Sequence, residues 1–322
     1  MPATEAAAPR WPRVRAGRGH YESWFLRAVH PTAPRGIWIR YTVSVAPGGP
    51  ATGQLWCTLF DRETRTRALR MDAGEPAPGG GSWIRLGDST FGGDGAFGTM
   101  RTPSGTAEWS LRASVEQPPL RHLPREWMYR ARLPRTKPLS IAPAAVFDGT
   151  VEVDGETLDV TGWPGMIGHN WGEQHAERWI WLHGLGFAGR AADTWLDVAI
   201  GRVRLGPVTT PWIANGALSL DGERFALGGL ARRVTVAETE DSCVVRIPGQ
   251  GATVTASVSA PAEAFAHWDY ANPDGDVHDV VNCSVADLAI RVERPGRDVL
   301  ELTAPSRAVY ELGVPAHGAA ST

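Results

Sequence analysis

The sequence predicts an all-β protein built from antiparallel strands, and two observations support this prediction. Apolar and other residues alternate over short stretches along much of the chain, as they do where one face of a strand is buried. Asp-Gly pairs at Asp154-Gly155 and Asp221-Gly222 separate such stretches, as they do in tight hairpins. No long window with a helical period competes with this pattern. Many short strands joined by hairpins are typical of barrels and sandwiches.

The expected strands follow one another closely along the chain. Ile37, Ile39 and Tyr41 alternate with Trp38 and Arg40, and the same period continues in residues 55–60. The Asp-Gly turns join residues 150–153 to 156–160 and residues 217–220 to 223–227. Further strand-like stretches are 179–187, 195–203, 231–236, 243–247, 253–258, 280–292 and 299–312. Residues 72–81 and 88–98 are expected to be long loops.

The number of strands is too large for one small barrel, so we expect two β domains. Prolines crowd into residues 117–143 and indicate a boundary there. We therefore expect a disordered tail over residues 1–19, a barrel-like domain over 20–130, a linker over 131–144 and a second barrel domain over 145–322. The tail is rich in Ala, Pro and Arg and lacks the apolar segment of a secretory signal, which predicts a cytoplasmic protein.

Composition excludes several classes of function. The chain has 322 residues, 43% of them hydrophobic, and a net charge of -3, so neither a nucleic-acid partner nor a transmembrane segment is expected. Peripheral contact with a membrane and the oligomeric state stay open. Lys137 is the only lysine, which leaves Schiff-base and P-loop chemistry without their usual residue. Cys57, Cys243 and Cys283 have neither disulfide nor zinc spacing. We expect no cofactor and no metal.

Residues 165–184 hold the densest group of chemically useful side chains. On one uninterrupted strand, alternate residues would share a face. These residues are His169, Trp171, Glu173, His175, Glu177, Trp179, Trp181 and His183. A bulge at Gly172 would shift this register. The pattern favours an aromatic wall with titratable groups, which suits an enclosed site for a hydrophobic, unsaturated ligand.

The segment Gly168-His-Asn-Trp-Gly172 followed by Trp179-Ile-Trp181, with the earlier segments 20–25 and 36–42, resembles a known superfamily. It includes carotenoid 1,2-hydratases (hydroxyneurosporene synthases), tocopherol cyclases and certain lipocalin-like Diels–Alder cyclases. The resemblance covers most of residues 20–312. It implies two tandem lipocalin-like β-barrel domains, with a hydrophobic ligand held in or between them. The hydratases carry an acidic residue directly before His-Asn-Trp-Gly, where this chain has Gly168.

Protonation of an alkene needs a carboxylic acid that burial keeps neutral. Tryptophan faces can then stabilise the carbocation, and a histidine can remove a proton or position water. Asp197 shares strand parity with Trp195 and so could face an aromatic interior. The catalytic candidates are Glu173, Asp197, His169 and His175. The candidate substrate-binding residues are Trp171, Trp179, Trp181, His183, Asn170, Glu22 and Trp24.

We therefore expect an enzyme that hydrates, cyclises or isomerises an isoprenoid or other polyene. One alternative is a carrier of a hydrophobic small molecule, and another is a structural stress-response protein. An enzyme needs a buried acid or base in contact with the cavity, whereas a carrier does not. Asp197 has its own alternative, which is burial only to bond backbone amides or an arginine. A metal site at the histidines would require the chain to bend at Gly172.

Overall fold

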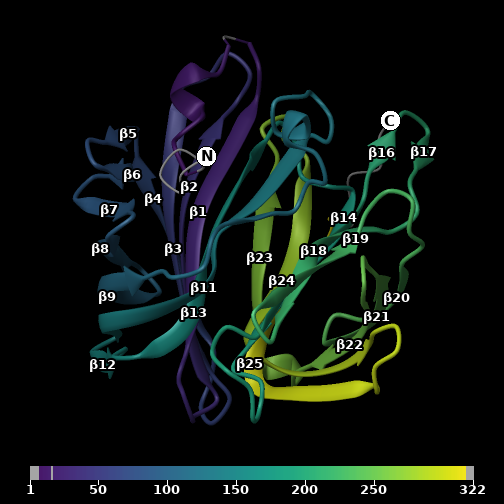
Figure 1. The fold of residues 1–322 in the computed structure, drawn as a ribbon. Coiled ribbons are helices and arrows are strands. Elements are labelled where there is room, and N and C mark those ends of the chain that lie inside the picture. Colours follow the sequence, from purple (N-terminus) through teal and green to yellow (C-terminus); the bar gives the residue numbers. More distant parts are fainter. Residues whose placement is uncertain (1–6, 16, 317–322) are drawn as a thin grey trace.

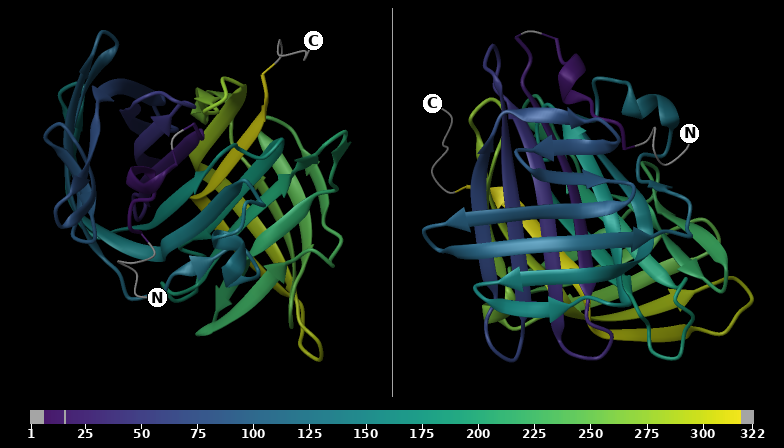
Figure 2. Two further views of the ribbon diagram at one scale, coloured as in Figure 1. Left: turned by 90° about the horizontal axis from the view of Figure 1, so that it is seen from above. Right: turned by 90° about the vertical axis from the view of Figure 1, so that its left-hand side faces the viewer.

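The computed structural model describes residues 7–15 and 17–316, and they form two large antiparallel sheets that lie side by side (Figure 1). Seen from above, the purple-to-blue strands curl into a nearly closed barrel, and the green-to-yellow strands form an open half-barrel beside it (Figure 2). The expected all-β architecture of two tandem barrels is confirmed. Helix is limited to short 3-10 turns among the described residues, which are η1 (Trp11–Arg13), η2 (Glu126–Tyr129) and η3 (Ala262–Ala264).

The first sheet has the strand order β4-β3-β2-β1-β13-β11-β9-β8-β7-β6-β5. Its strands are β1 (His20–Val29), β2 (Arg35–Val45), β3 (Ala51–Asp61), β4 (Arg67–Gly74), β5 (Pro76–Gly79), β6 (Ser82–Leu86), β7 (Ser89–Gly92), β8 (Gly95–Thr102), β9 (Gly105–Ser114), β10 (Leu120–Arg121), β11 (Thr136–Val153), β12 (Glu156–Asp159) and β13 (Trp163–Gly172). The expected loops at 72–81 and 88–98 are wrong, because most of these residues lie in β4 to β8. Such short strands show too little alternation to be recognised. Their turns use glycines with positive φ, such as Gly87.

The second sheet has the order β19-β18-β15-β14-β25-β24-β22-β21-β20, and β23 pairs with β24. Its strands are β14 (Arg178–Leu185), β15 (Trp195–Arg202), β18 (Ile213–Leu220), β19 (Glu223–Gly228), β20 (Thr235–Glu238), β21 (Ser242–Pro248), β22 (Thr253–Ser259), β23 (Ala266–Ala271), β24 (Val277–Glu293) and β25 (Leu300–Pro315). A separate hairpin is formed by β16 (Arg204–Leu205) and β17 (Val208–Thr209). The two Asp-Gly pairs form the expected hairpin turns, with positive φ at Asp154 and Asp221.

The expected linker at 131–144 is misplaced. From Thr136 onward the chain belongs to β11, which pairs with β13 in the first sheet. Two of the prolines that indicated a boundary, Pro138 and Pro143, lie within this strand, and its register shifts between Ser140 and Ala142 and again between Ala142 and Ala145. Such bulges accommodate residues that lack an N–H for the ladder. The chain passes from the first sheet to the second between Gly172 and Arg178, so the first sheet spans 20–172 and the second begins at 178.

The described part of the expected tail is ordered against β1. The backbone N–H groups of Arg10 and Trp11 donate to the carboxylate of Glu22, and the carbonyl of Ala7 accepts from Trp24 Nε1 at 2.9 Å. These hydrogen bonds give the segment fixed partners, so the expectation of disorder is wrong for residues 7–15. Residues 1–6 and 16 lie outside the described part of the chain.

Alternation along β2 explains how the two sheets meet. Ile37, Ile39 and Tyr41 point into the core of the first barrel, whereas Trp38 packs with the core of the second sheet. The outer face of the barrel is thus an inner surface of the whole molecule. Across this interface Arg27, which is fully buried, donates to the carbonyl of Ser284 at 2.9 Å. No helix in the described residues is long and apolar enough to cross a membrane.

Candidate active site

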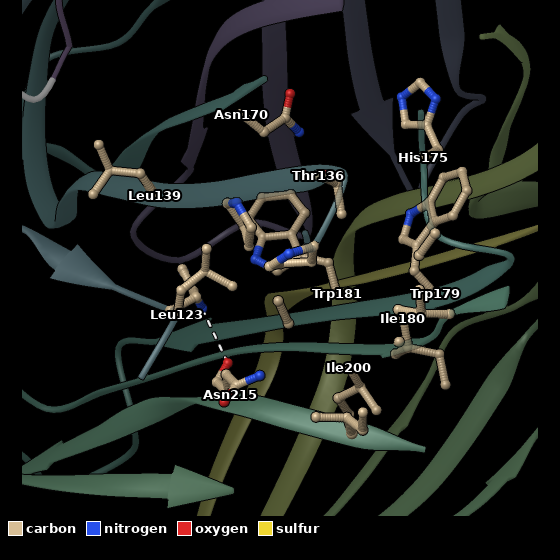
Figure 3. Close-up of a pocket in the computed structure, with 18 of the residues that line it drawn as sticks. Leu123, Thr136, Leu139, Asn170, His175, Trp179, Ile180, Trp181, Ile200 and Asn215 are labelled. Atoms are coloured by element: carbon tan, nitrogen blue, oxygen red, sulfur yellow. Dashed lines mark hydrogen bonds between the residues drawn. The ribbon is translucent and has the colours of Figure 1, made fainter. Parts of the chain in front are cut away.

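A cavity of about 420 Å³ lies between the two sheets (Figure 3). The first sheet contributes residues of β1, β2, β11 and β13, and the second contributes residues of β14, β15, β18, β23 and β25. Residues around η2 line it as well. Most of the lining is aromatic or aliphatic, so the cavity is suited to an apolar molecule.

Trp179 and Trp181 lie two residues apart on β14 and both line this cavity (Figure 3). The ring of Phe25, from β1, meets Trp181 edge-on with centroids 5.2 Å apart. Asn170 lines the cavity from β13 and accepts a hydrogen bond from Ser23 Oγ at 2.5 Å. Aromatic rings from both sheets therefore face the same space.

The single strand face expected over residues 169–183 does not exist. β13 ends at Gly172 and β14 begins at Arg178, and the two strands belong to different sheets. A Cβ at Gly172 would clash with the carbonyl oxygen of Arg135, so the close approach of these two backbones requires a glycine. His169 and Trp171 consequently belong to the first barrel, and only the tryptophans after the crossover lie on the second sheet.

Glu173 is not the buried acid that the sequence suggested. It lies in the crossover just after β13, where its side chain is 31% exposed and pairs with Arg18 at 3.0 Å. It does not line the cavity. Glu173 therefore lacks the enclosed, apolar surroundings that the expected acid needs.

Asp197 is fully buried behind residues that line the cavity. It accepts hydrogen bonds from Ser140 Oγ at 2.5 Å and from Trp181 Nε1 at 3.1 Å. Ser140 Oγ lies 3.1 Å from His122 Nε2, and His122 Nδ1 lies 3.1 Å from the carbonyl oxygen of Asn215. The partners of Asp197 are therefore a hydroxyl, an indole and, at 3.7 Å, the His122 ring, and they include neither backbone amides nor an arginine.

Asp197, Ser140 and His122 form a hydrogen-bonded relay. A carbonyl oxygen only accepts, so His122 Nδ1 donates to Asn215. Ser140 Oγ lies between Asp197 Oδ2 and His122 Nε2, and these two atoms are themselves 3.7 Å apart. The Ser140 hydroxyl therefore connects the buried carboxyl group of Asp197 to the cavity-lining histidine.

Glu311, on β25, is the one acid among the cavity-lining residues of the described chain. Trp179 Nε1 donates to its Oε1 and Asn282 Nδ2 to its Oε2, both at 2.9 Å, and Tyr270 Oη lies 3.5 Å from Oε2. Burial raises the pKa of Glu311 despite these hydrogen bonds and the nearby positive charge of Arg40. The geometry places a buried acid with a raised pKa against an aromatic wall.

Sequence reasoning missed Glu311. Its only local signal is an isolated acid between Tyr310 and Leu312 in an otherwise apolar stretch. Its place opposite Trp181 comes from the pairing of β14 with β25, which the sequence does not show.

His175 lies in the crossover and lines the cavity from the Trp179 side (Figure 3). Its ring stacks on Tyr21 at 4.1 Å, and its Nδ1 donates to Asn272 Oδ1 at 2.7 Å. Nε2 is buried and has no hydrogen-bond partner. Burial, reinforced by the positive charge of Arg40, lowers the pKa of His175 to about 3 although the hydrogen bond to Asn272 opposes this. The neutral ring therefore presents an unsatisfied acceptor.

Glu22, Trp24 and Trp171 lie within the first barrel and not on the cavity. His169 Nε2 donates to Glu22 at 2.8 Å, and Trp24 stacks on the same ring at 4.7 Å. Trp171 packs in the barrel core, and of this group only His169 lines the cavity. Burial alone would raise the pKa of Glu22, but hydrogen bonds from His169 and His20 outweigh it and lower the pKa to about 2.

His183 is part of the interface between the sheets. Its Nδ1 accepts from Arg27 at 2.9 Å and its Nε2 donates to the carbonyl of Pro143 at 2.8 Å. Burial lowers its pKa to about 4. Both nitrogens are engaged, so the ring joins the two sheets and does not face a ligand.

The structure explains why a glycine, Gly168, and not an acidic residue precedes His-Asn-Trp-Gly. A Cβ at Gly168 would clash with the ring of Phe25, which lines the cavity. The phenyl ring thus fills the space that an acidic side chain would need, and the acid that lines this cavity, Glu311, comes from β25.

No family model matches this sequence. The sequence is similar to two proteins of Mycobacterium tuberculosis, "Uncharacterized protein Rv0493c" of strain H37Rv and "Uncharacterized protein MT0513" of strain CDC 1551. Each is 30% identical over 296 residues, which cover 89% of this chain and 84% of the relative. The chain belongs to their family.

Solved structures extend the comparison to the fold. CghA aligns with a TM-score of 0.62 and 12% identity over 98% of this chain and 93% of its own. Kievitone hydratase from Nectria haematococca aligns with a TM-score of 0.53 and 10% identity over 93% and 89%. The resemblance to the carotenoid hydratase and lipocalin-like cyclase superfamily is confirmed at the level of the fold.

Proposed function

We propose that this protein is an enzyme that acts on a hydrophobic, unsaturated small molecule in the cavity between the sheets, with Glu311 as the proton donor. The observation that carries the proposal is a buried acid in direct contact with an aromatic cavity. A carrier has no need of such a group, because burying an ionisable side chain in an apolar site costs free energy.

The first chemical step would be transfer of the Glu311 proton to one carbon of a double bond. The resulting carbocation would lie against the faces of Trp179 and Trp181, each worth about 1 to 2 kcal/mol in a water-poor site. Attack by water gives hydration, attack by a second double bond gives cyclisation, and loss of a neighbouring proton gives isomerisation. In each case the released proton returns to Glu311, directly or by way of His175 Nε2, so the enzyme ends as it began.

The Asp197–Ser140–His122 relay would supply a second place for a proton in the same cavity. Ser140, His122 and Trp181 line it, and all three contact the buried Asp197. A water molecule held by these groups could lose its proton without a moving side chain. Kievitone hydratase is named for a hydration, and its shared fold supports this class of reaction without fixing the substrate.

Native mass spectrometry of the protein from its producer would identify a bound small molecule, and turnover of that molecule would then be measured. Glu311→Gln keeps the shape of the side chain but has no transferable proton, so we expect turnover to fall at least about 100-fold. Glu173→Gln is the matched control and should keep full activity. Full turnover by Glu311→Gln would refute the proton-donor role, and tight binding with no turnover by the wild-type protein would favour a carrier.

A further inference from the structure

Arg40 is the one arginine or lysine among the cavity-lining residues of the described chain, and its side chain is buried. It lies on β2 with Trp38, on the barrel face that meets the second sheet. Only 5% of the residue is exposed. An arginine is ionised at any ordinary pH, so a full positive charge lies in this apolar cavity.

The protein supplies little to balance that charge. No carboxylate oxygen lies within 4.0 Å of the Arg40 guanidinium in the described residues, and Arg40 Nε has no hydrogen-bond partner. Buried charges are normally paired, because an uncompensated one is costly. Glu311, the acid that lines the cavity, is not within 4.0 Å of the Arg40 guanidinium, and burial raises its pKa.

Aromatic rings partly stabilise the guanidinium. Its Cζ lies 4.2 Å from the centroid of Tyr270, 5.4 Å from that of Trp56 and 5.8 Å from that of Trp38. These faces hold the group in place but carry no net negative charge. The rings therefore orient a cation whose Nε–H is still unsatisfied.

We propose that Arg40 binds the carboxylate of the ligand, and that the cavity takes an amphipathic molecule with an apolar, unsaturated body and an anionic head. Arginine suits this role because its planar donors match the two oxygens of a carboxylate. The unsatisfied acceptor of His175, in the same cavity, suits a hydroxyl or N–H near that head. The inference rests on the proposed function only in placing an apolar small molecule between the sheets.

The position of the head would also set the position of the double bonds. Arg40 and Glu311 both contact Tyr270, one over its ring and the other near its hydroxyl. An anion on Arg40 would leave the adjoining part of the chain beside Glu311. A second negative charge there would also oppose ionisation of Glu311 and keep it in the acid form.

The test compares two fluorescent polyenes that differ only in the head, cis-parinaric acid and its methyl ester. Their dissociation constants would be measured with the wild-type protein and with Arg40→Met, Arg40→Lys and Arg70→Met. Arg70 is the matched control, because it also stacks on Trp56, at 4.9 Å, but is exposed and does not line the cavity.

We expect the wild-type protein to bind the acid at least tenfold more tightly than the ester. Arg40→Met should abolish this preference, Arg40→Lys should keep part of it and Arg70→Met should leave it unchanged. Equal binding of acid and ester by the wild-type protein, or an unchanged preference in Arg40→Met, would overturn the proposal, as would failure of both polyenes to bind.

The melting temperature of the ligand-free protein gives a second, independent result. Removing an unbalanced buried charge should leave the melting temperature of Arg40→Met equal to or above that of the wild type. A large drop would show that Arg40 serves the fold and would overturn its assignment to a ligand. Neither measurement involves turnover, so the anion site can fail or hold separately from the proposed reaction.

Discussion

Glu173, Asp197 and Glu311 carry the same kind of acidic group in three different environments. Glu173 is partly exposed and paired with an arginine, Asp197 is buried against a hydroxyl and an indole, and Glu311 faces an apolar cavity. The environment of a carboxyl group decides whether it can act as an acid, because desolvation and hydrogen bonding determine whether its protonated or its ionised form is populated. Of the three, Glu311 combines contact with the cavity and a raised pKa.

The dependence of turnover on pH should report that raised pKa. Glu311 must be protonated to act as an acid, so kcat/KM should be fully present below its pKa and be lost as the pH rises through it. The falling limb should therefore lie above the usual range of a glutamate. Glu173→Gln should show the same profile as the wild type. A profile that already falls at the ordinary glutamate pKa would contradict the assignment.

Glu22 should make the protein sensitive to acid. Its pKa of about 2 lies below the usual 4.5, so its ionised form stabilises the folded state at neutral pH. This stabilisation, about 3 kcal/mol, should be lost as the pH falls from about 4.5 toward 2. Denaturant unfolding between pH 6 and 2 would measure the loss, and Glu22→Gln should be less stable at pH 6 but lose less across that range. If the unfolding free energies of the two proteins changed with pH in parallel, Glu22 would not be the source of the acid sensitivity.

At the scale of elements, backbone contacts decide which side chains reach the cavity. β13 and β14 were expected to be one strand, yet they lie in different sheets because the chain leaves β13 at Gly172. β11 carries its prolines within the sheet by means of two register shifts. These local irregularities bring Ser140 of β11 next to Asp197 of β15.

Gly168 and Phe25 should be energetically coupled. Gly168→Ala places a methyl group against the Phe25 ring and should cost about 1 to 3 kcal/mol of unfolding free energy. In a Phe25→Ala background the same change should cost much less, since the ring is absent. A double-mutant cycle by denaturant unfolding measures this coupling. Additive effects would show that the two positions do not compete for space.

For the whole molecule, part of the interface between the sheets is hydrophobic core. Trp38, Trp56 and Phe60 of the first sheet belong to the apolar cluster of the second, and Arg27 crosses the interface to Ser284 and His183. Such an interface should make the two halves unfold together, although the sequence suggested two separate domains. The cavity exists only because both halves are present.

Arg27→Ala should weaken that interface. It removes a buried side chain and leaves the Ser284 carbonyl and His183 Nδ1 without their donor, which should cost about 3 kcal/mol or more. Calorimetry should show one unfolding transition for the wild type. The transition of the variant should occur at a lower temperature, be broader or divide into two. The exposed Arg233→Ala should change stability by less than about 0.5 kcal/mol. If Arg27→Ala had the stability of the wild type, the two halves would be held together by apolar contacts alone.

The sequence by itself determined the all-β class, the Asp-Gly hairpins and the resemblance to a two-barrel superfamily, because these depend on alternation, turn residues and motifs that are local in the chain. It also indicated Trp179, Trp181 and His175, which do line the cavity. Only the tertiary structure decided the boundary between the sheets and the groups at the site. Trp181 meets Glu311, and Ser140 meets Asp197, through pairing and packing of distant strands. Their burial, and with it their chemistry, depends on neighbours that no local pattern specifies.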